Sequence, residues 1–288
     1  MASQRSGTLR VGLLHPGEMG AALGAALKAC GYSVAWASER RSPATAARAV
    51  DAGLEDAGTL AELARRSDVI VSVCPPDGAA AVASAVAGFS GLYVDANAVS
   101  PSLSRLIGAT IEEGGARFVD GALIGPPPRA AGDTRLYLCG EHATAAGELF
   151  SRSIVDAIVL GGELGTASAL KMAYAAWTKG SAALLLLARA LARAEGVEDA
   201  LLEEWRASGP QLEERSRQAA QSATTKGWRW VSEMNEIAAT LREAGLPGGA
   251  HEAAGEVFAA APRQASAGAD EATADGVLDR LLGAKPVA

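Results

Sequence analysis

The chain is poor in the residues that carry metal, disulfide or redox chemistry. Among its 288 residues only three are histidines and three are cysteines. The cysteines, Cys30, Cys74 and Cys139, stand far apart, without the spacing of a metal or redox motif. We therefore expect reduced thiols, as in a cytoplasmic protein, and no dedicated metal site.

The chain also lacks an excess of positive charge and a long apolar run. Acidic residues outnumber basic residues by 33 to 26, and the net charge of −7 argues against nucleic acid as a main partner. The longest purely aliphatic run, residues 182–188, is far too short to span a bilayer, and residues 1–7 have no signal-peptide core. We expect a cytoplasmic protein that acts on a small-molecule substrate.

What the chain does have is a regular alternation of short apolar strands with helical patterns. The expected strands cover residues 9–14, 33–37, 69–73, 92–95, 117–120 and 135–139, and the expected helices between them cover 18–30, 43–51, 59–66, 79–87 and 102–114. This order predicts an α/β domain with a parallel sheet that is covered on both faces.

Beyond residue 160 the strand patterns end and helical patterns take over. Residues 166–194 indicate one long helix that is apolar almost all round, and shorter helices are expected over 198–208, 211–221, 228–244 and 249–258. Residues 265–273 resemble a loose connection before a last short helix. We therefore expect an α/β domain over residues 1–160 and an all-helical domain over residues 161–288.

A glycine turn joins the first expected strand to the first expected helix. A strand, a glycine turn and a helix in this order form the unit that binds a dinucleotide, because the helix N-terminus offers N–H groups and partial positive charge to the pyrophosphate. We expect the cofactor over residues 16–19. The cofactor-binding residues predicted around this turn are Gly12, Leu14, His15, Pro16, Gly17, Glu18, Met19 and Gly20.

The first position of the dinucleotide fingerprint departs from its pattern. The fingerprint G-x-G-x-x-G requires three glycines, and here the first is His15, while Gly17 and Gly20 stand at the second and third positions. We expect the His15 side chain to contact the cofactor, and the alternative is a packing variant.

The end of the second expected strand predicts which nicotinamide nucleotide binds. Ser38 is followed by Glu39, Arg40 and Arg41, where folds that prefer NAD usually place an acid for the ribose hydroxyl. A hydroxyl and two arginines suit the 2′-phosphate of NADPH, because a guanidinium pairs with phosphate through two hydrogen bonds. A solvated basic turn, with Glu39 on a free ribose, is the alternative.

Two further loops follow expected strands at the place where ligands bind in open α/β sheets. Cys74, Pro75 and Pro76 end the strand over residues 69–73, and Asn97 follows the strand over residues 92–95. We expect all four residues to line the cofactor site. A stiff connecting turn is the alternative for the prolines, and a local side-chain turn is the alternative for Asn97.

Two more segments are candidates for the substrate site. After Asp120, residues 124–128 are Ile124, Gly125, Pro126 and two further prolines, a stiff loop with few donors that suits a pocket wall or a plain surface turn. Lys171 lies early in the long apolar helix, with Tyr174 one turn later on the same face. Burial lowers a lysine pKa towards the range useful for proton transfer, whereas an amine that reaches the surface would have no such role.

These pieces, in this order, resemble the β-hydroxyacid dehydrogenase superfamily, which includes 3-hydroxyisobutyrate dehydrogenases, 6-phosphogluconate dehydrogenases and the related imine reductases. Residues 12–20 resemble the glycine motif of the family. Residues 120–126 align with its substrate-loop motif, Asp-x-x-x-Ser-Gly-Gly, and residues 165–171 match its catalytic motif, Gly-x-x-x-x-x-Lys. The resemblance implies a Rossmann domain, a long interdomain helix, a helical C-terminal domain, a homodimer and Lys171 as general acid/base.

The chain departs from the family at the substrate positions. The serine and two glycines that hold a substrate carboxylate are Ile124, Gly125 and Pro126 here, and the asparagine four residues after the catalytic lysine is Ala175. The histidine of 6-phosphogluconate dehydrogenases is Tyr174. A sugar phosphate or a small hydroxy acid therefore fits poorly, and the chain looks most like a bacterial subgroup with a Gly-Pro-Pro-Pro loop.

The C-terminal half adds candidate pocket residues, namely Trp177, Trp230, Glu233 and Met234. Each of them also suits the helical core. Together they would close an apolar pocket with one acid, which favours an amine or iminium substrate. Our first hypothesis is an NADPH-dependent reductase of a carbonyl, with Lys171 and Tyr174 as catalytic residues. An imine or enamine reductase and a non-catalytic NADP-binding protein are the alternatives.

Overall fold

The computed structural model describes residues 8–264 and 266–283. They form two compact units that divide between Lys171 and Met172. The first unit is built on one eight-stranded sheet, with strand order β3-β2-β1-β4-β5-β6-β7-β8. The strands are β1 (Arg10–Leu13), β2 (Ser33–Trp36), β3 (Glu55–Asp56), β4 (Val69–Ser72), β5 (Leu92–Asp95), β6 (Arg117–Ile124), β7 (Arg135–Cys139) and β8 (Asp156–Val159).

Every strand pair of this sheet is parallel except β6 with β7, which is antiparallel. The chain runs outwards from β1 through β2 to β3 and then returns to pair β4 with β1 on the other side. The strand order therefore reverses between β1 and β4. The carboxyl ends of β1, β4, β5 and β6 lie at one edge of the sheet, which is where open α/β sheets bind their ligands.

Helices cover both faces of the sheet, because successive apolar side chains of its strands point to opposite faces and both faces must be buried. In β4, Val69 and Val71 pack into one apolar cluster, and Ile70 packs into the cluster on the opposite face. Leu23 of α1 belongs to the first cluster, and Ile107 of α5 belongs to the second. The helices of this unit are α1 (Glu18–Ala29), α2 (Pro43–Asp51), α3 (Leu60–Arg66), α4 (Pro76–Ser84), α5 (Pro101–Glu113) and α6 (Ala143–Glu148). The expected Rossmann-type α/β unit is confirmed.

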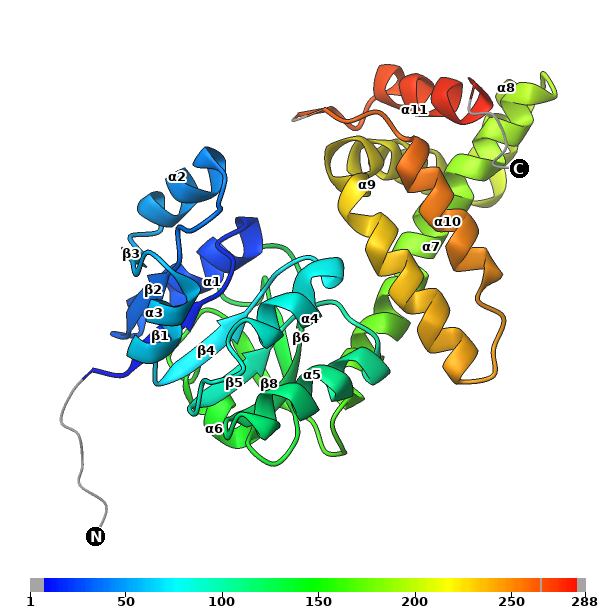
Figure 1. Cartoon of the computed structure of the whole chain (residues 1–288). Coiled ribbons are helices and arrows are strands. Elements are labelled where there is room, and N and C mark those ends of the chain that lie inside the picture. Colours follow the sequence, from blue (N-terminus) through cyan, green and yellow to red (C-terminus); the bar gives the residue numbers. More distant parts are fainter. Residues whose placement is uncertain (1–7, 265, 284–288) are drawn as a thin grey trace, which may run out of the picture. The chain divides into compact units, whose positions relative to one another are not determined.

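The second unit is helical, as predicted. It contains most of α7 (Thr166–Ala194) together with α8 (Glu198–Ser208), α9 (Leu212–Glu243), α10 (Gly249–Ala260) and α11 (Glu271–Gly283) (Figure 1). The division after Lys171, rather than at residue 160, follows from α7, whose first turn is hydrogen-bonded to the sheet unit. Within the part of the chain that the structure describes, no helix is both long enough and apolar enough to cross a membrane.

Several expected element boundaries were wrong. The separate helices over 211–221 and 228–244 are one helix, α9, because Ala223, Thr224 and Gly227 between them are buried and no proline interrupts them. β6 continues past Asp120 to Ile124, so the expected loop begins four residues later. Strands β3 and β8 and helix α6 were not expected. Residue 265 of the expected loose connection lies outside the described residues, and residues 271–273 belong to α11.

Candidate functional site

The glycine turn between β1 and α1 is shaped by one close backbone contact. A Cβ atom on Gly20 would lie 2.1 Å from the carbonyl oxygen of His15, so this position admits only glycine. Gly17 is the N-cap of α1 and brings no side-chain acceptor of its own, which leaves the helix N-terminus suited to a phosphate. Leu14 is completely buried behind the turn, and Met19 packs partly buried against the core.

Two arginines reach this turn from the segment that follows β2. The Arg41 guanidinium donates to His15 Nδ1 over 2.9 Å and to the Leu14 carbonyl over 3.1 Å. Arg48 Nε donates to the Pro16 carbonyl over 3.4 Å. Arg41 Nε is buried and has no acceptor in the part of the chain that the structure describes. Positive charge and an unused donor beside a helix N-terminus fit a nucleotide phosphate.

The other predicted residues of this segment lie around that cluster. Arg40 is exposed and has a φ of 57°, in the left-handed region that few residues other than glycine adopt. The Ser38 N–H donates to Asp56 Oδ1, which also accepts from the Gly58 N–H. The hydrogen bonds from these two N–H groups help to lower the pKa of Asp56 against the opposing effect of burial.

Asn97 ties together the loops at the carboxyl ends of β4 and β5. Its Oδ1 accepts from the Cys74 N–H over 2.6 Å, its Nδ2 donates to Ser72 Oγ over 3.0 Å, and its own N–H donates to Asp95 Oδ1. Asn97 thus shapes the Cys74-Pro75-Pro76 loop from within. Burial raises the pKa of the Cys74 thiol to about 12, so the thiol stays protonated at neutral pH.

Asp95 is an unexpected member of this group. Its side chain is buried, and its Oδ2 has no hydrogen-bond partner among the described residues. Burial raises the pKa of Asp95 to about 7, and the charge of Asp120 acts in the same direction. The sequence offered a signal, since an acid ends an otherwise apolar strand, but only the fold shows that this acid is buried.

Asp120 holds the start of α7 rather than a substrate. Its Oδ2 accepts from the backbone N–H groups of Gly165, Ala167 and Ser168 over 3.0, 3.0 and 3.1 Å. Its Oδ1 accepts from the hydroxyls of Ser104 and Ser168 over 3.0 and 2.6 Å. A carboxylate at a helix N-terminus satisfies unpaired N–H groups and the positive end of the dipole at once. This contact fixes the helix that carries Lys171.

Lys171 lies against the far end of β6. Its Nζ donates to the Leu123 carbonyl over 2.8 Å, in the part of β6 that continues past its pairing with β5. Burial lowers the pKa of Lys171 to about 8. The amine therefore exchanges protons near neutral pH, beside the edge of the sheet at which β1, β4 and β5 end.

The loop after β6 is short of hydrogen-bond donors, as predicted. Ile124 is buried in the strand, and Gly125 and Pro126 are exposed. Gly125 has a φ of 122°, and a Cβ there would lie 2.0 Å from the Asp133 carbonyl oxygen. The Pro126 carbonyl accepts from the Thr134 hydroxyl. The loop is therefore fixed by its own contacts and has neither the hydroxyl nor the flexible glycines that could hold a carboxylate.

The predicted residues of the helical unit divide into exposed and enclosed groups. Tyr174 and Trp177 on α7 are 46% and 68% exposed. Glu233 pairs with Lys179, and each side chain is only 14% exposed. Trp230 packs edge-on against Phe258. Met234 is completely buried in the helical unit, on the part of α9 that faces the core, and its contact with a substrate stays a prediction.

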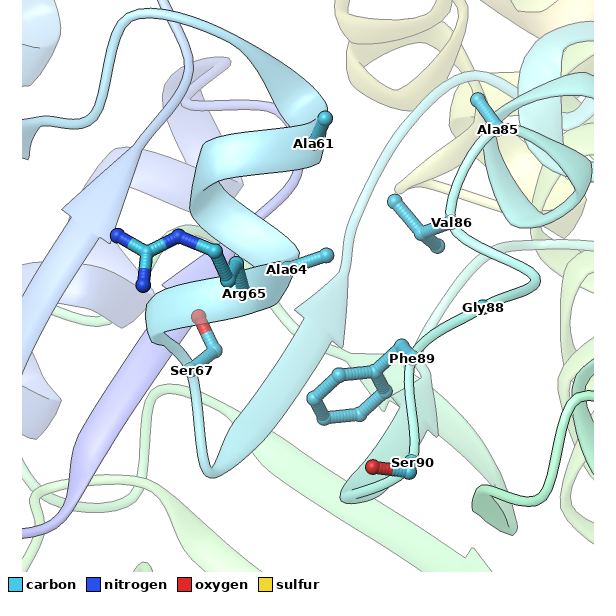
Figure 2. Close-up of a pocket in the computed structure, with 9 residues that line it drawn as sticks. All are labelled: Ala61, Ala64, Arg65, Ser67, Ala85, Val86, Gly88, Phe89 and Ser90. Carbon is cyan, nitrogen blue, oxygen red and sulfur yellow. The ribbon is translucent and has the colours of Figure 1, made fainter.

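One open cavity lies away from this chemistry. It has a volume of about 490 Å³ and is lined from α3 and from the segment after α4 (Figure 2). Ser67 and Ser90 on its rim precede β4 and β5, so the cavity is at the amino ends of these strands. It cannot be the cofactor site, which requires the opposite edge. No cluster of three or more metal-ligating side chains occurs within residues 8–264 and 266–283.

Comparisons with known proteins agree with the class of fold. Residues 10–151 match the NAD binding domain of 6-phosphogluconate dehydrogenase, and residues 192–261 match a domain of unknown function, DUF1932. An uncharacterized 28.5 kDa protein of Methanothermus fervidus is 31% identical over 196 residues, which cover 68% of this chain and 75% of that protein.

Solved structures share the architecture of the whole chain. The conserved protein MTH1747, described as similar to 3-hydroxyacid dehydrogenases, is 29% identical, with a TM-score of 0.66 over 87% of this chain and 96% of that chain. At 16% identity, a Mycobacterium tuberculosis 3-hydroxyisobutyrate dehydrogenase has a TM-score of 0.70 over 96% and 99%. At 20% identity, a reductive aminase of Aspergillus terreus has a TM-score of 0.56 over 88% and 93%.

The first unit is thus the nicotinamide-nucleotide-binding domain of an oxidoreductase family. The chain belongs to the β-hydroxyacid dehydrogenase superfamily, whose members include 3-hydroxyisobutyrate dehydrogenases and imine reductases.

Proposed function

We propose that the chain is an NADPH-dependent oxidoreductase that reduces a carbonyl of a small organic substrate, or oxidises the matching alcohol. The observation that carries this proposal is the buried Lys171 amine, whose pKa of about 8 suits proton transfer at the cofactor edge of the sheet. The substrate class is one without a carboxylate, since the loop at Ile124, Gly125 and Pro126 has no groups to hold one.

The residues around the glycine turn would hold the nucleotide. The N-terminus of α1 would accept the pyrophosphate, and Arg41 with Arg48 would supply positive charge for the phosphates. We expect NADPH to be preferred over NADH, because Arg41 and Arg48 bring positive charge to the turn and a guanidinium suits the 2′-phosphate. When bound, the reduced nicotinamide supplies a hydride to the carbonyl carbon.

Lys171 supplies the matching proton. In the direction of reduction, its ammonium group donates a proton to the carbonyl oxygen as negative charge develops there. In the direction of oxidation, the neutral amine removes the hydroxyl proton. The Leu123 carbonyl accepts a hydrogen bond from Nζ and so fixes the amine in one place. Tyr174, three residues further along α7, would assist as a second polar group of the relay.

Imine reduction is the weaker candidate. The loss of the carboxylate-binding loop is compatible with an imine substrate, but an unpaired acid in an apolar pocket would be needed to favour an iminium, and Glu233 is paired with Lys179. A paired carboxylate gives no preference for a cationic iminium substrate. The retained Lys171 also favours a substrate whose oxygen needs a proton.

We also propose that the chain forms a homodimer through its helical unit. Leu184, Leu187 and Leu191 on α7 are 67%, 40% and 64% exposed, and a second copy would cover this apolar face. Sedimentation of the purified chain measures this, and a monomer at micromolar concentration would contradict it.

The deciding experiment replaces Lys171 by Met and measures both turnover and nucleotide binding. We expect turnover to fall by about 10²–10⁴-fold, the usual contribution of a general acid, with the affinity for NADPH nearly unchanged. In the wild type, reduction should slow as the pH rises through about 8, and oxidation should accelerate over the same range.

The control is Lys28→Met, since Lys28 is an exposed lysine whose amine also donates to a backbone carbonyl, that of Gly53. A panel of ketones, hydroxy acids and cyclic imines supplies the substrates. Wild-type activity that survives in Lys171→Met would overturn the role of the lysine, and no binding of either nucleotide by the wild type would overturn the enzyme itself.

A further inference from the structure

We propose that His15 is a positioning residue that fixes Arg41 for the 2′-phosphate of NADPH, and that it is not primarily a contact for the cofactor. The inference rests on the proposed preference for NADPH. Two observations support it. His15 stands where the fingerprint has its first glycine, and its Nδ1 is hydrogen-bonded to Arg41.

The hydrogen bond between the two residues allows only one arrangement of protons. A guanidinium has donors and no acceptor, so His15 Nδ1 must accept with its lone pair, and the imidazole is neutral with its proton on Nε2. The Leu14 carbonyl is the second acceptor for Arg41. Two acceptors on successive residues therefore hold the two terminal nitrogens of one guanidinium.

The imidazole lies close to the backbone of the turn. A Cβ on Gly17 would lie 3.4 Å from His15 Cδ2 and 3.8 Å from Nε2, so the ring lies over the N-cap of α1. A Cβ atom at position 17 would be in ordinary van der Waals contact with the ring. The glycine that lets the backbone approach a pyrophosphate in other chains here also leaves room for the histidine.

With its terminal nitrogens anchored, the guanidinium keeps an edge for a ligand. Arg41 Nε is the buried donor without an acceptor among the described residues, and an arginine edge that includes Nε pairs with phosphate through two hydrogen bonds. Fixing a long side chain before the ligand arrives removes part of the entropy cost of binding. A glycine at position 15 would leave Arg41 with the Leu14 carbonyl alone.

The test is the affinity for NADPH and for NADH, each measured by fluorescence titration in a series of His15 variants. His15→Phe keeps a ring but removes the acceptor, and we expect NADPH affinity to fall by about 5–10-fold, with NADH affinity changed by less than about twofold. His15→Asn places Oδ1 where Nδ1 was, and it should restore NADPH affinity to within about twofold of the wild type.

An Arg41→Ala background separates positioning from direct contact. If His15 acts through Arg41, His15→Phe has no further effect on NADPH affinity in that background. Equal losses for NADPH and NADH, an additive loss in the Arg41→Ala background, or an unchanged affinity in His15→Phe would each overturn the inference. A wild type that prefers NADH would instead overturn the proposed cofactor, and it is detected before any variant is made.

Discussion

The two units of the chain treat buried charge in opposite ways. In the sheet unit, the Asp120 carboxylate is met by backbone N–H groups, hydroxyls and a thiol, and the Lys171 amine is met by a backbone carbonyl. In the helical unit, Arg189 is 0% exposed and is met by the carboxylates of Glu198 and Glu271. One unit surrounds charges with dipoles, and the other pairs charge with charge.

The difference separates groups that can change protonation from groups that cannot. Burial without a counter-charge moves a pKa towards neutrality, to about 8 for Lys171 and to about 7 for Asp95. Ion pairs drive the pKa values of both partners away from neutrality, as for Glu198, whose neighbouring arginines overcome the effect of burial and lower its pKa. The sheet unit thus contains groups whose pKa lies near neutrality, and the helical unit buries its arginine in a network of ion pairs.

The largest loss of stability is expected on removal of the Asp120 carboxylate, which is bound by backbone N–H groups and hydroxyls. Asp120→Ala leaves the N–H groups at the start of α7 and two serine hydroxyls without their acceptor, and it should lower the free energy of unfolding by about 3–5 kcal/mol. Denaturant unfolding measures this loss. Asp133→Ala is the control, because Asp133 also accepts from two backbone N–H groups but is only partly buried. Similar losses in the two variants would contradict the distinct role of Asp120.

The next effect tests the charge network of the helical unit. Glu198 accepts from both Arg189 and Arg193, so Glu198→Ala leaves the buried guanidinium with Ser216 and the half-exposed Glu271. We expect the free energy of unfolding to fall by about 2–3 kcal/mol, and calorimetry measures this loss. Glu214→Ala removes an exposed partner of Arg217 and should cost less than about 0.5 kcal/mol. Equal losses of stability in the two variants would show that the burial of Arg189 does not increase the contribution of its ion pairs.

The smallest effect appears only as a dependence on pH. The folded state raises the pKa of Asp95 to about 7, so the stability that the protonated acid contributes is complete below its unfolded pKa of about 4 and is lost as the pH rises through 7. Asp95→Asn keeps the Oδ1 that accepts from the Asn97 N–H and cannot ionise. Relative to the wild type, it should gain about 1–2 kcal/mol of stability between pH 6 and pH 8. Denaturation midpoints at the two pH values measure this, and parallel pH profiles would refute it.

Much of the fold followed from local patterns, and the exceptions have physical reasons. Helices α2, α7 and α8 have the predicted bounds because capping residues, proline or glycine mark their ends. Strand β3 was missed because it consists of Glu55 and Asp56, two exposed acids that owe their strand geometry to β2. The continuity of α9 depends on small residues buried by tertiary packing, which no local pattern reveals.

The site was predicted as a set of positions but not as a set of contacts. The sequence placed His15 and Arg41 in separate roles, because they are far apart along the chain and come together only when β1 pairs with β2. Asn97 was predicted to meet the cofactor, and the structure adds contacts of its amide with Cys74 and Ser72 that the sequence did not indicate. Asp120 was part of a substrate-loop motif, and its partners lie at the start of α7. Nothing in the spacing of these residues gives such distances.

The close approach of Gly20 to the His15 carbonyl has a consequence for how such chains are searched for. A side chain at the third position of the fingerprint would collide with the backbone of the turn, whereas the first position here holds a histidine. The first glycine can therefore be replaced in a chain of this fold, while the third cannot. A search pattern that demands all three would discard chains like this one, and a pattern anchored on the third would keep them.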